Sequence, residues 1–148
     1  MVFHKFIVPK TEIHTYLNVE NHSFFEAYMK EFLHDSRIYY TPIEFAMAHI
    51  GGTWKIPILV SLRDGALRYG DLKNAIPHIS DKMLYTQLRE LEDKNMVIRH
   101  TFFEKPPRVE YQLTQKAEKA LLIIDQLTEY GIFLMEEIGI DTTSETEQ

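Results

Sequence analysis

The chain has 148 residues, of which 45% are hydrophobic and 26% charged, a composition typical of one soluble globular domain. It contains no cysteine, which excludes disulfides, thiol catalysis and cysteine-ligated zinc, and no apolar run approaches the ~20 residues that a membrane-spanning helix needs. The formal net charge is −6, but residues 37–113 carry 11 lysines and arginines against 9 acidic residues, so the acidic total does not exclude a nucleic-acid partner.

The first 36 residues are expected to form an N-terminal extension with one amphipathic helix, residues 23–34. Ser23 followed by Glu26 fits a capping box. Apolar residues then recur at helical spacing at Phe25, Tyr28, Met29 and Phe32. This face is expected to pack against the domain or against a partner subunit. The N-terminus shows no signal-peptide pattern, which favours a cytoplasmic protein.

The segment "TPIEFAMAHIGG" carries helix start and stop signals. Thr41 is predicted to cap a helix, Pro42 suits the first helical position, and Glu44 completes a capping box. Gly51 and Gly52 are predicted to end the helix.

A second helix is predicted in "TWKIPILVSLRDG". Thr53 is its expected N-cap, and Pro57 falls within or just past the first turn, where proline is tolerated. The helix should end at Asp64–Gly65. The next residues predict a very short strand, Leu67–Arg68, and then a short helix from Tyr69 to Ile76.

A longer helix is predicted in "SDKMLYTQLRELEDKN". Ser80 is expected to cap it and Asn95 to end it. Its buried side is expected at Leu84, Leu88 and Leu91.

Two strands and a last helix complete the pattern. "VIRHTFF" and "RVEYQL" are joined by "EKPP" and are predicted to pair as a hairpin. In the second strand Val109, Tyr111 and Leu113 alternate with polar residues. The last helix begins near Thr114. Its wide apolar face consists of Leu121, Ile124, Leu127, Phe133, Leu134 and Ile138.

The order of a short helix, a tight turn, a longer helix and a hairpin predicts a winged helix-turn-helix in a mainly α (α+β) fold. The longer helix then places one face on the core and the other in a DNA major groove. The expected organisation is an extension at 1–36, a DNA-binding core at 37–114, a dimerisation helix at 115–140 and a flexible tail at 141–148.

Three segments, "IGGTWKIPIL", "LRYGDLKNAIPHISDKMLYTQLRELE" and "PPRVEYQLT", resemble the signature segments of HxlR-type transcriptional regulators. The match covers roughly residues 41–114 and leaves residues 1–36 mostly outside. The resemblance implies a bacterial or archaeal DNA-binding regulator, commonly a repressor, with no cofactor. It also implies a homodimer whose first core helix and last helix form the interface. Two-fold symmetry then places the recognition helices roughly 34 Å apart on a near-palindromic operator.

The candidate DNA-binding residues lie mainly on the longer helix and the hairpin. With the leucines inward, Lys82, Thr86 and Arg89 face outward, where they suit phosphate contact and base reading. Lys105 and Arg108 flank the two prolines of the hairpin; Arg108 can instead brace it, so Lys105 is the safer DNA contact. The full predicted set is Ser80, Lys82, Met83, Tyr85, Thr86, Gln87, Arg89, Lys105, Arg108, Lys55 and Arg68. For Lys55, a phosphate contact and a solvated side chain are equally good interpretations.

The candidate dimer interface is apolar. Its predicted members are Ile43, Phe45, Ala46, Leu121, Ile124, Leu127, Phe133 and Leu134. The apolar face of the last helix is too large for a solvated surface helix, which independently predicts a partner surface.

One departure from the family pattern concerns regulation. Many HxlR-type regulators sense oxidants through a cysteine just before the first core helix, whereas this chain has Thr41 there. Threonine keeps the capping role but is no redox thiol. A small-molecule effector would have to act non-covalently or through another nucleophile. The aromatic residues of the N-terminal extension, with Tyr39, Tyr40 and Phe45, either line a pocket for it or, as we favour, belong to the dimer core.

Two other function classes have less support. The seven histidines include no pair at i, i+4 spacing, so no metal site is predicted, and no nucleophile–base set predicts an enzyme. A winged-helix protein-interaction module without DNA binding remains the alternative, favoured slightly by the acidic total. Lys82, Arg89, Lys105 and Arg108 have no clear purpose in such a module.

Overall fold

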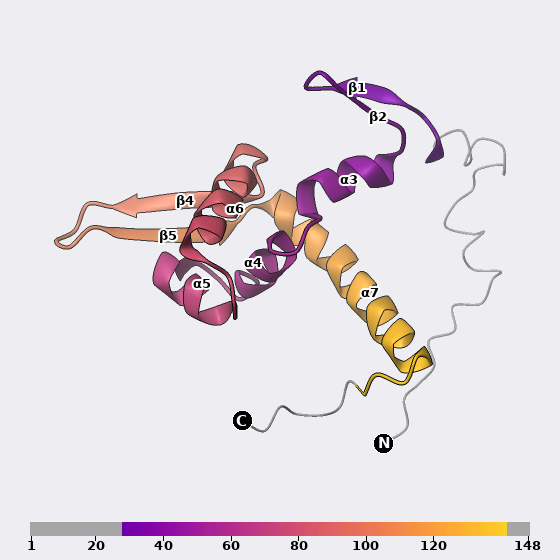
Figure 1. Ribbon diagram of the computed structural model, residues 1–148. Coiled ribbons are helices and arrows are strands. Elements are labelled where there is room, and N and C mark those ends of the chain that lie inside the picture. Colours follow the sequence, from indigo (N-terminus) through magenta and orange to yellow (C-terminus); the bar gives the residue numbers. More distant parts are fainter. Residues whose placement is uncertain (1–27, 142–148) are drawn as a thin grey trace. The chain divides into compact units, whose positions relative to one another are not determined.

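The computed structural model describes residues 28–141, drawn in colour in Figure 1. Contacts within the chain divide it into two compact units, Met1–Ala46 and Met47–Gln148. In the described range no helix is long and apolar enough to cross a membrane. The tail predicted at 141–148 lies outside the described residues beyond Asp141.

A hairpin precedes the first helix in the first unit. β1 (Phe32–His34) pairs antiparallel with β2 (Arg37–Tyr39). The two turn residues, Asp35 and Ser36, have left-handed backbone with φ of 47° and 61°. Two such residues form the tight hairpin turn whose twist matches that of its strands. The turn therefore sets the register of the hairpin.

The helix predicted over residues 23–34 is wrong at its C-terminal end, because Phe32 begins a strand. The Phe32 ring stacks on that of Tyr39 across the hairpin with centroids 5.5 Å apart, and Phe45 packs edge-on against both rings. This cross-strand packing overrides the helical spacing of the apolar residues. The start of that predicted helix lies outside the described residues.

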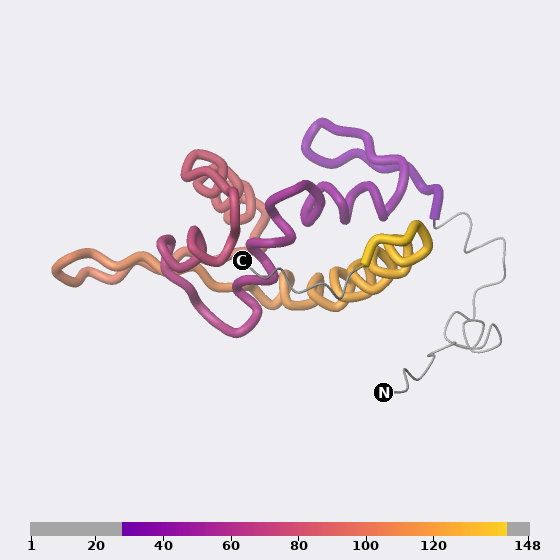
Figure 2. Tube along the Cα trace, turned by 60° about the horizontal axis from the view of Figure 1, so that its bottom comes forward, coloured from indigo at the N-terminus to yellow at the C-terminus, as the bar shows by residue number. Residues whose placement is uncertain are grey.

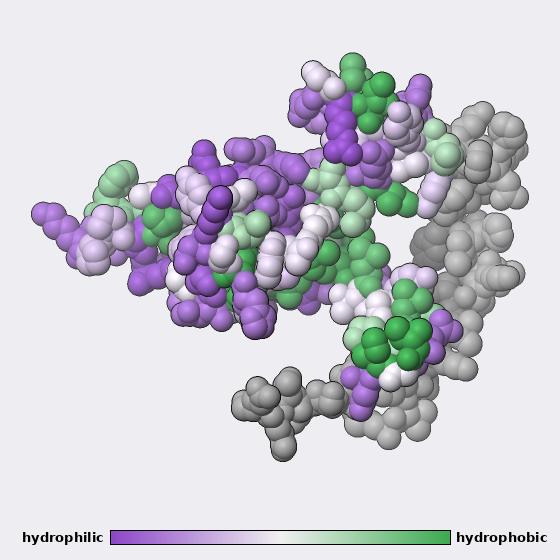
Figure 3. Space-filling view, viewed as in Figure 1, coloured by the Kyte–Doolittle hydropathy of each residue, from purple (hydrophilic) through white to green (hydrophobic). Residues whose placement is uncertain are grey.

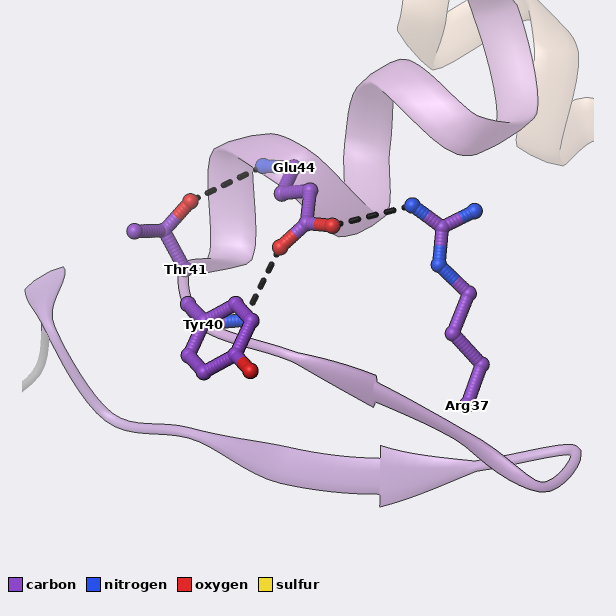
Figure 4. A network of polar contacts seen from close by, with 4 residues as sticks. All are labelled: Arg37, Tyr40, Thr41 and Glu44. Carbon is purple, nitrogen blue, oxygen red and sulfur yellow. Dashed lines mark hydrogen bonds and ion pairs between the residues drawn. The ribbon is translucent and has the colours of Figure 1, made fainter.

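The Thr41 cap predicted for the first helix, α3 (Pro42–Ile50), is confirmed, but the other half of the predicted capping box differs (Figure 4). Thr41 Oγ1 accepts a hydrogen bond from the Glu44 N–H at 3.0 Å. The Glu44 carboxylate accepts from the Tyr40 N–H at 2.9 Å and from Arg37 Nη2 at 2.9 Å. The return bond thus reaches the residue before the cap, and Arg37 ties β2 to the helix start. These bonds, that of Tyr40 first, hold the pKa of Glu44 below its usual value.

The two glycines after α3, Gly51 and Gly52, are required for different steric reasons. A Cβ on Gly51 would lie 2.5 Å from the carbonyl oxygen of Met47. Gly52 has a φ of 108°, which L side chains rarely adopt. Both positions require glycine, so the predicted end of the helix is confirmed.

The next helix, α4 (Lys55–Ser61), starts later than predicted. Its N-cap position is Trp54, which makes no side-chain capping bond, so Thr53 is not the cap. The turn that follows left-handed Gly52 takes up Thr53 before helical geometry begins. Pro57 lies in the first turn, where an N–H would have no intrahelical acceptor.

The second unit contains the helix-turn-helix and the wing. α5 (Tyr69–Ala75) and α6 (Asp81–Asp93) are followed by β4 (Val97–Phe102) and β5 (Arg108–Leu113). β3 (Leu67–Arg68) pairs with β5, which gives an antiparallel sheet of order β3–β5–β4. Figures 1 and 2 both show the β4–β5 hairpin projecting beyond the helices as a wing. The predicted winged helix-turn-helix, mainly α with a small sheet, is confirmed.

The core of this unit includes the predicted leucines of α6. Leu84, Leu88 and Leu91 are at most 1% exposed. The other fully buried large side chains are Ile58, Leu59, Leu62, Leu72, Ile79, Met96 and Ile124. β5 adds Tyr111 and Leu113, as its alternation predicts. Burial of one face of α6 leaves its other face to solvent.

Both ends of α6 are fixed by local hydrogen bonds. Ser80 Oγ accepts from the Met83 N–H at 3.1 Å, which confirms the predicted cap. Asn95 has a φ of 56°, and the Met96 N–H donates to the Leu91 carbonyl at 2.8 Å. This is the Schellman arrangement, in which a left-handed residue ends the helix.

The last helix, α7 (Gln115–Glu137), is anchored at its N-terminal end. Thr114 Oγ1 accepts from the Ala117 N–H at 3.2 Å and donates to the Asn95 carbonyl at 2.8 Å. The residues that α7 buries in the core are Ala117, Ala120, Leu121 and Ile124. Most residues after Asp125 are exposed. Only the first half of α7 therefore belongs to the core of this unit.

Candidate nucleic-acid interface

Two side chains of α5 fix the start of α6. The Tyr69 hydroxyl donates to the carbonyl oxygen of Asp81 at 3.0 Å, and Lys73 Nζ donates to that of Ile79 at 2.5 Å. Burial, followed by the charge of the Asp81 carboxylate, raises the pKa of Tyr69, so the hydroxyl keeps its proton and continues to donate. The first turn of α6 is thus held through its backbone, and its outward side chains are left available.

The outward face of α6 carries most of the predicted DNA-binding side chains. Ser80, Lys82, Met83, Tyr85, Thr86 and Arg89 are exposed, and Gln87 is half-buried. Lys82, Thr86 and Arg89 lie opposite the three buried leucines, and the other four residues lie at the flanks or the N-terminal end of the helix. Positive charge, hydrogen-bonding groups and an aromatic ring therefore share one accessible surface.

Some of these polar groups already have partners on the helix. Ser80 caps it, the Thr86 hydroxyl donates to the Lys82 carbonyl at 2.8 Å, and Arg89 Nη1 lies 3.5 Å from Glu92 Oε2. Lys82 forms no ion pair with any residue in the described part of the chain. An exposed i, i+3 pair contributes little, so Arg89 can exchange Glu92 for a base or phosphate.

Lys55 does not belong to this surface. Its side chain is buried, and its Nζ lies 2.8 Å from Oε2 of Glu90, a partly exposed residue at the flank of α6. Neither the phosphate contact nor the solvated side chain that its sequence position allowed is correct. Lys55 joins α4 to α6 and is therefore not a candidate DNA contact.

Arg108 braces the base of the wing. Its Cζ lies 4.1 Å from the centroid of the Phe102 ring. Its guanidinium also pairs with Glu104 at 3.3 Å and with Glu110 at 3.5 Å, and its side chain is only 29% exposed. These contacts occupy Arg108 within the hairpin, which makes it a poor candidate for a direct DNA contact.

Arg68 and Lys105 border a hollow of about 420 Å³ between β3–α5 and the wing. It is lined by residues 68–70 and 104–109. Arg68 Nε lies 3.9 Å from Glu110 Oε1, yet the side chain is 60% exposed. Lys105 is exposed and makes no ion pair with any residue between 28 and 141. Two accessible cations beside the wing suit the phosphates of a DNA backbone.

Phe103, at the tip of the wing (residues 103–107), is absent from the predicted set. The sequence predicts a strand that extends to Phe103, but β4 ends at Phe102. Phe103 is 99% exposed. The signal in the sequence is the break in alternation: two apolar residues stand in succession where the strand ends.

The predicted dimer interface needs correction. Leu121 and Ile124 are 9% and 2% exposed and belong to the core of their own unit, because the first half of α7 covers that core. Phe45 packs on Phe32 and Tyr39 within the first unit. Ile43, Ala46, Leu127, Phe133 and Leu134 are exposed. Further exposed apolar residues of α7 are Leu122, Ile123, Tyr130, Ile132 and Met135, and Figure 3 shows this apolar surface in green.

Two of the aromatic residues suggested for an effector pocket, Tyr39 and Phe45, pack against each other. Tyr39 is 8% exposed and packs against Phe45, with ring centroids 5.0 Å apart, while Tyr40 is exposed. This packing agrees better with a filled aromatic cluster than with a ligand site. Between residues 28 and 141 no group of His, Asp and Glu side chains could hold a metal ion.

A comparison with models of protein families identifies the family to which this winged helix-turn-helix belongs. A model of the HxlR-like helix-turn-helix family matches residues 49–138, from the end of α3 to the residue after α7. The chain belongs to the HxlR-like helix-turn-helix family. The family resemblance predicted from the sequence is confirmed, and with it the class of DNA-binding, helix-turn-helix transcriptional regulators.

Individual relatives of this HxlR-like protein support the same family assignment. It is 43% identical over 93 residues to a helix-turn-helix-type transcriptional regulator of Methanothermobacter thermautotrophicus, covering 63% of this chain and 71% of that one. The crystal structure of the regulator YtcD matches with a TM-score of 0.62 and 36% identity over 65% of this chain and 98% of that chain. The redox regulator HypR in its reduced form matches with a TM-score of 0.63 and 35% identity over 66% and 97%.

Proposed function

We propose that this HxlR-like protein is a sequence-specific DNA-binding repressor that acts as a homodimer. In this proposal α6 enters the major groove, and the wing lies on the minor groove or the backbone. The observation that carries it is the exposed outward face of α6, with Lys82 and Arg89, followed directly by a wing whose Lys105 forms no ion pair with residues 28–141. Arg68, at the base of the same wing, adds a further accessible cation.

The homodimer is supported by an exposed apolar stripe that runs along α7 to its C-cap residue. Ile123, Leu127, Tyr130, Leu134 and Ile138 recur every three or four residues, and all are at least 41% exposed. Residues at this spacing share one side of a helix. A contiguous apolar stripe of this kind is expected to be covered by a partner surface. A second copy of α7 would supply that surface and place two copies of α6 about one DNA turn apart, roughly 34 Å.

We further propose that control does not use a cysteine switch. HypR is a redox regulator, but these 148 residues contain no cysteine. Thr41 occupies the position before α3 and uses its hydroxyl as the helix cap. A small-molecule effector would therefore bind without a thiol bond.

The DNA proposal is tested by mobility shift with the DNA upstream of the protein's own coding region, over a range of salt concentrations. Salt-sensitive binding that weakens with Arg89→Ala is expected. Lys119→Ala is the control, because Lys119 is an exposed lysine on α7 that lies on neither α6 nor the wing and is not in the predicted DNA-binding set. No salt-sensitive binding, or equal binding by Arg89→Ala, would reject the proposal. The first of these results would leave the protein-interaction module, which the acidic residues after 114 favour.

A further inference from the structure

The tip of the wing presents a bare aromatic ring. Phe103 is 99% exposed, whereas the preceding Phe102 is covered by the Arg108 guanidinium at 4.1 Å. We propose that Phe103 is an apolar wedge that enters the minor groove and inserts its ring between two stacked base pairs, thereby kinking the operator. This inference rests on the proposed function as a DNA-binding regulator.

The exposure of Phe103 does not by itself indicate a wedge, since single exposed apolar side chains are common on protein surfaces. The position of Phe103 at the tip of the wing is what indicates a contact with DNA. Phe103 directly follows β4, at the end of the hairpin that Figures 1 and 2 show projecting from the helices. No part of the unit between residues 47 and 141 covers the ring, so a partner can reach nearly all of it.

The base of the wing is held rigid enough to direct the ring. Arg108 stacks on Phe102 and pairs with Glu104 and Glu110, which link both strands to the start of the tip. The two prolines of the tip remove further backbone freedom. A ring carried on a rigid support loses little conformational entropy when it is inserted.

The charges around the ring are compatible with DNA. Glu104 is the acidic residue next to Phe103, and its carboxylate is paired with Arg108 at 3.3 Å. Lys105, two residues after the ring, makes no ion pair with any residue that the structure describes. Lys105 can therefore contact a phosphate beside the groove that the ring enters. This arrangement of an apolar tip with an adjacent cation favours DNA over a purely apolar protein partner.

Insertion of such a ring has a defined physical consequence. Apolar side chains that enter from the minor groove partly unstack a base step and kink the duplex by roughly 20–90° toward the major groove. Pyrimidine–purine steps unstack most easily, so the wedge would favour them without any hydrogen bond to a base. Phe103 would then contribute to sequence preference through the deformability of the DNA.

The experiment uses a duplex that the full-length wild-type protein recovers from a pool of random duplexes. Its bend is measured by energy transfer between dyes on its two ends. Phe103→Ala is expected to lose most of the bend and to bind about tenfold more weakly, with the dependence on salt unchanged. Phe103→Leu, which keeps an apolar wedge, should retain most of the bend. Because Phe103 touches almost nothing in the free protein, neither variant should change the thermal unfolding temperature.

Lys105→Ala is the matched control on the same tip, and it should reduce the salt dependence while keeping the bend. An unchanged bend with Phe103→Ala would overturn the wedge, whether or not binding weakens. A change in oligomeric state without a change in bend would also overturn it and would assign Phe103 to a protein contact. If the wild-type protein recovers no duplex at all, the proposed function fails and the wedge fails with it.

Discussion

Lys55 Nζ lies 2.8 Å from Glu90 Oε2 and joins α4 to α6. The Lys55 side chain is 11% exposed and that of Glu90 42%. The hydrogen bond from Lys55 outweighs the desolvation of Glu90 and holds the pKa of this carboxyl below its usual value. The pair therefore supports the position of α6 without using any group on its outward face.

Lys55→Met is expected to lower the free energy of unfolding by about 1 kcal/mol. Methionine keeps the buried apolar stem but removes the ammonium. Because the Glu90 carboxylate is partly exposed, solvent screening brings the loss closer to that of a surface pair than of a buried one. Urea unfolding measures this change. DNA affinity of the folded protein should stay unchanged, and a large loss of affinity would return Lys55 to the interface.

The contribution of this pair should depend on pH. The pKa of Glu90 is lower in the folded than in the unfolded state, so its ionisation stabilises the fold above the unfolded pKa. That stability is lost as the pH falls through the folded value. The difference in unfolding free energy between wild type and Lys55→Met should therefore shrink below a pH of about 4. A difference that stays constant down to pH 3 would contradict the assignment.

Lys105→Ala should weaken binding to all duplexes alike. A lysine that contacts one phosphate releases about one counterion, so its loss should reduce the slope of log affinity against log salt by about 0.9. The slope is measured by titration at several salt concentrations, with Lys119→Ala as the control. A loss confined to one DNA sequence would instead indicate a base contact.

Arg89→Ala should act at one base pair. Arg89 can form two parallel hydrogen bonds to a guanine edge, and its loss should cost about 1–3 kcal/mol on duplexes that carry the preferred base. Duplexes substituted at single positions measure the effect. Arg89→Lys should not restore the preference, because lysine lacks the planar fork. Equal weakening on every duplex would make Arg89 a phosphate contact.

The sequence predicted the features that depend on a few neighbouring residues. Thr41 with Glu44, Ser80 and Thr114 mark helix starts because each side chain bonds to the backbone three residues on. The period of the leucines in α6 predicted its buried side, and hence the outward face. The alternation in β5 predicted the strand of the wing. Each of these signals is complete within one segment.

The predictions from the sequence that are wrong involve residues whose packing or ion-pair partners lie elsewhere in the chain. Phe32 has helical spacing from Met29, yet it stacks on Tyr39 across a turn. Lys55 looked like an accessible cation because its partner, Glu90, is on another helix. Ile124 stands on the same apolar face as exposed residues of α7, and periodicity cannot show where the core ends along a helix. Such pairings arise from tertiary packing, so the structure is needed to identify them.

The exposed stripe of α7 predicts the effect of charge at its centre. Leu127→Glu together with Leu134→Glu should convert the proposed dimer to a monomer at micromolar concentration, because two carboxylates would be buried without partners. Sedimentation velocity measures the mass. Leu122→Glu is the matched control, since Leu122 is 70% exposed and lies off this stripe. A monomeric wild-type protein, or a double variant that stays dimeric, would contradict the interface.

Substitutions at Thr41 distinguish a capping role of this position from a redox role. Thr41→Ala should lower the free energy of unfolding by about 1 kcal/mol because the Glu44 N–H loses its acceptor, whereas Thr41→Ser should keep most of the stability. Treatment with the thiol oxidant diamide should leave the DNA affinity of the wild-type protein unchanged, since it has no thiol. Thr41→Cys adds a thiol at this position, and any effect of diamide should be confined to that variant. Loss of wild-type binding after diamide would mean that control by oxidation acts through a group other than cysteine.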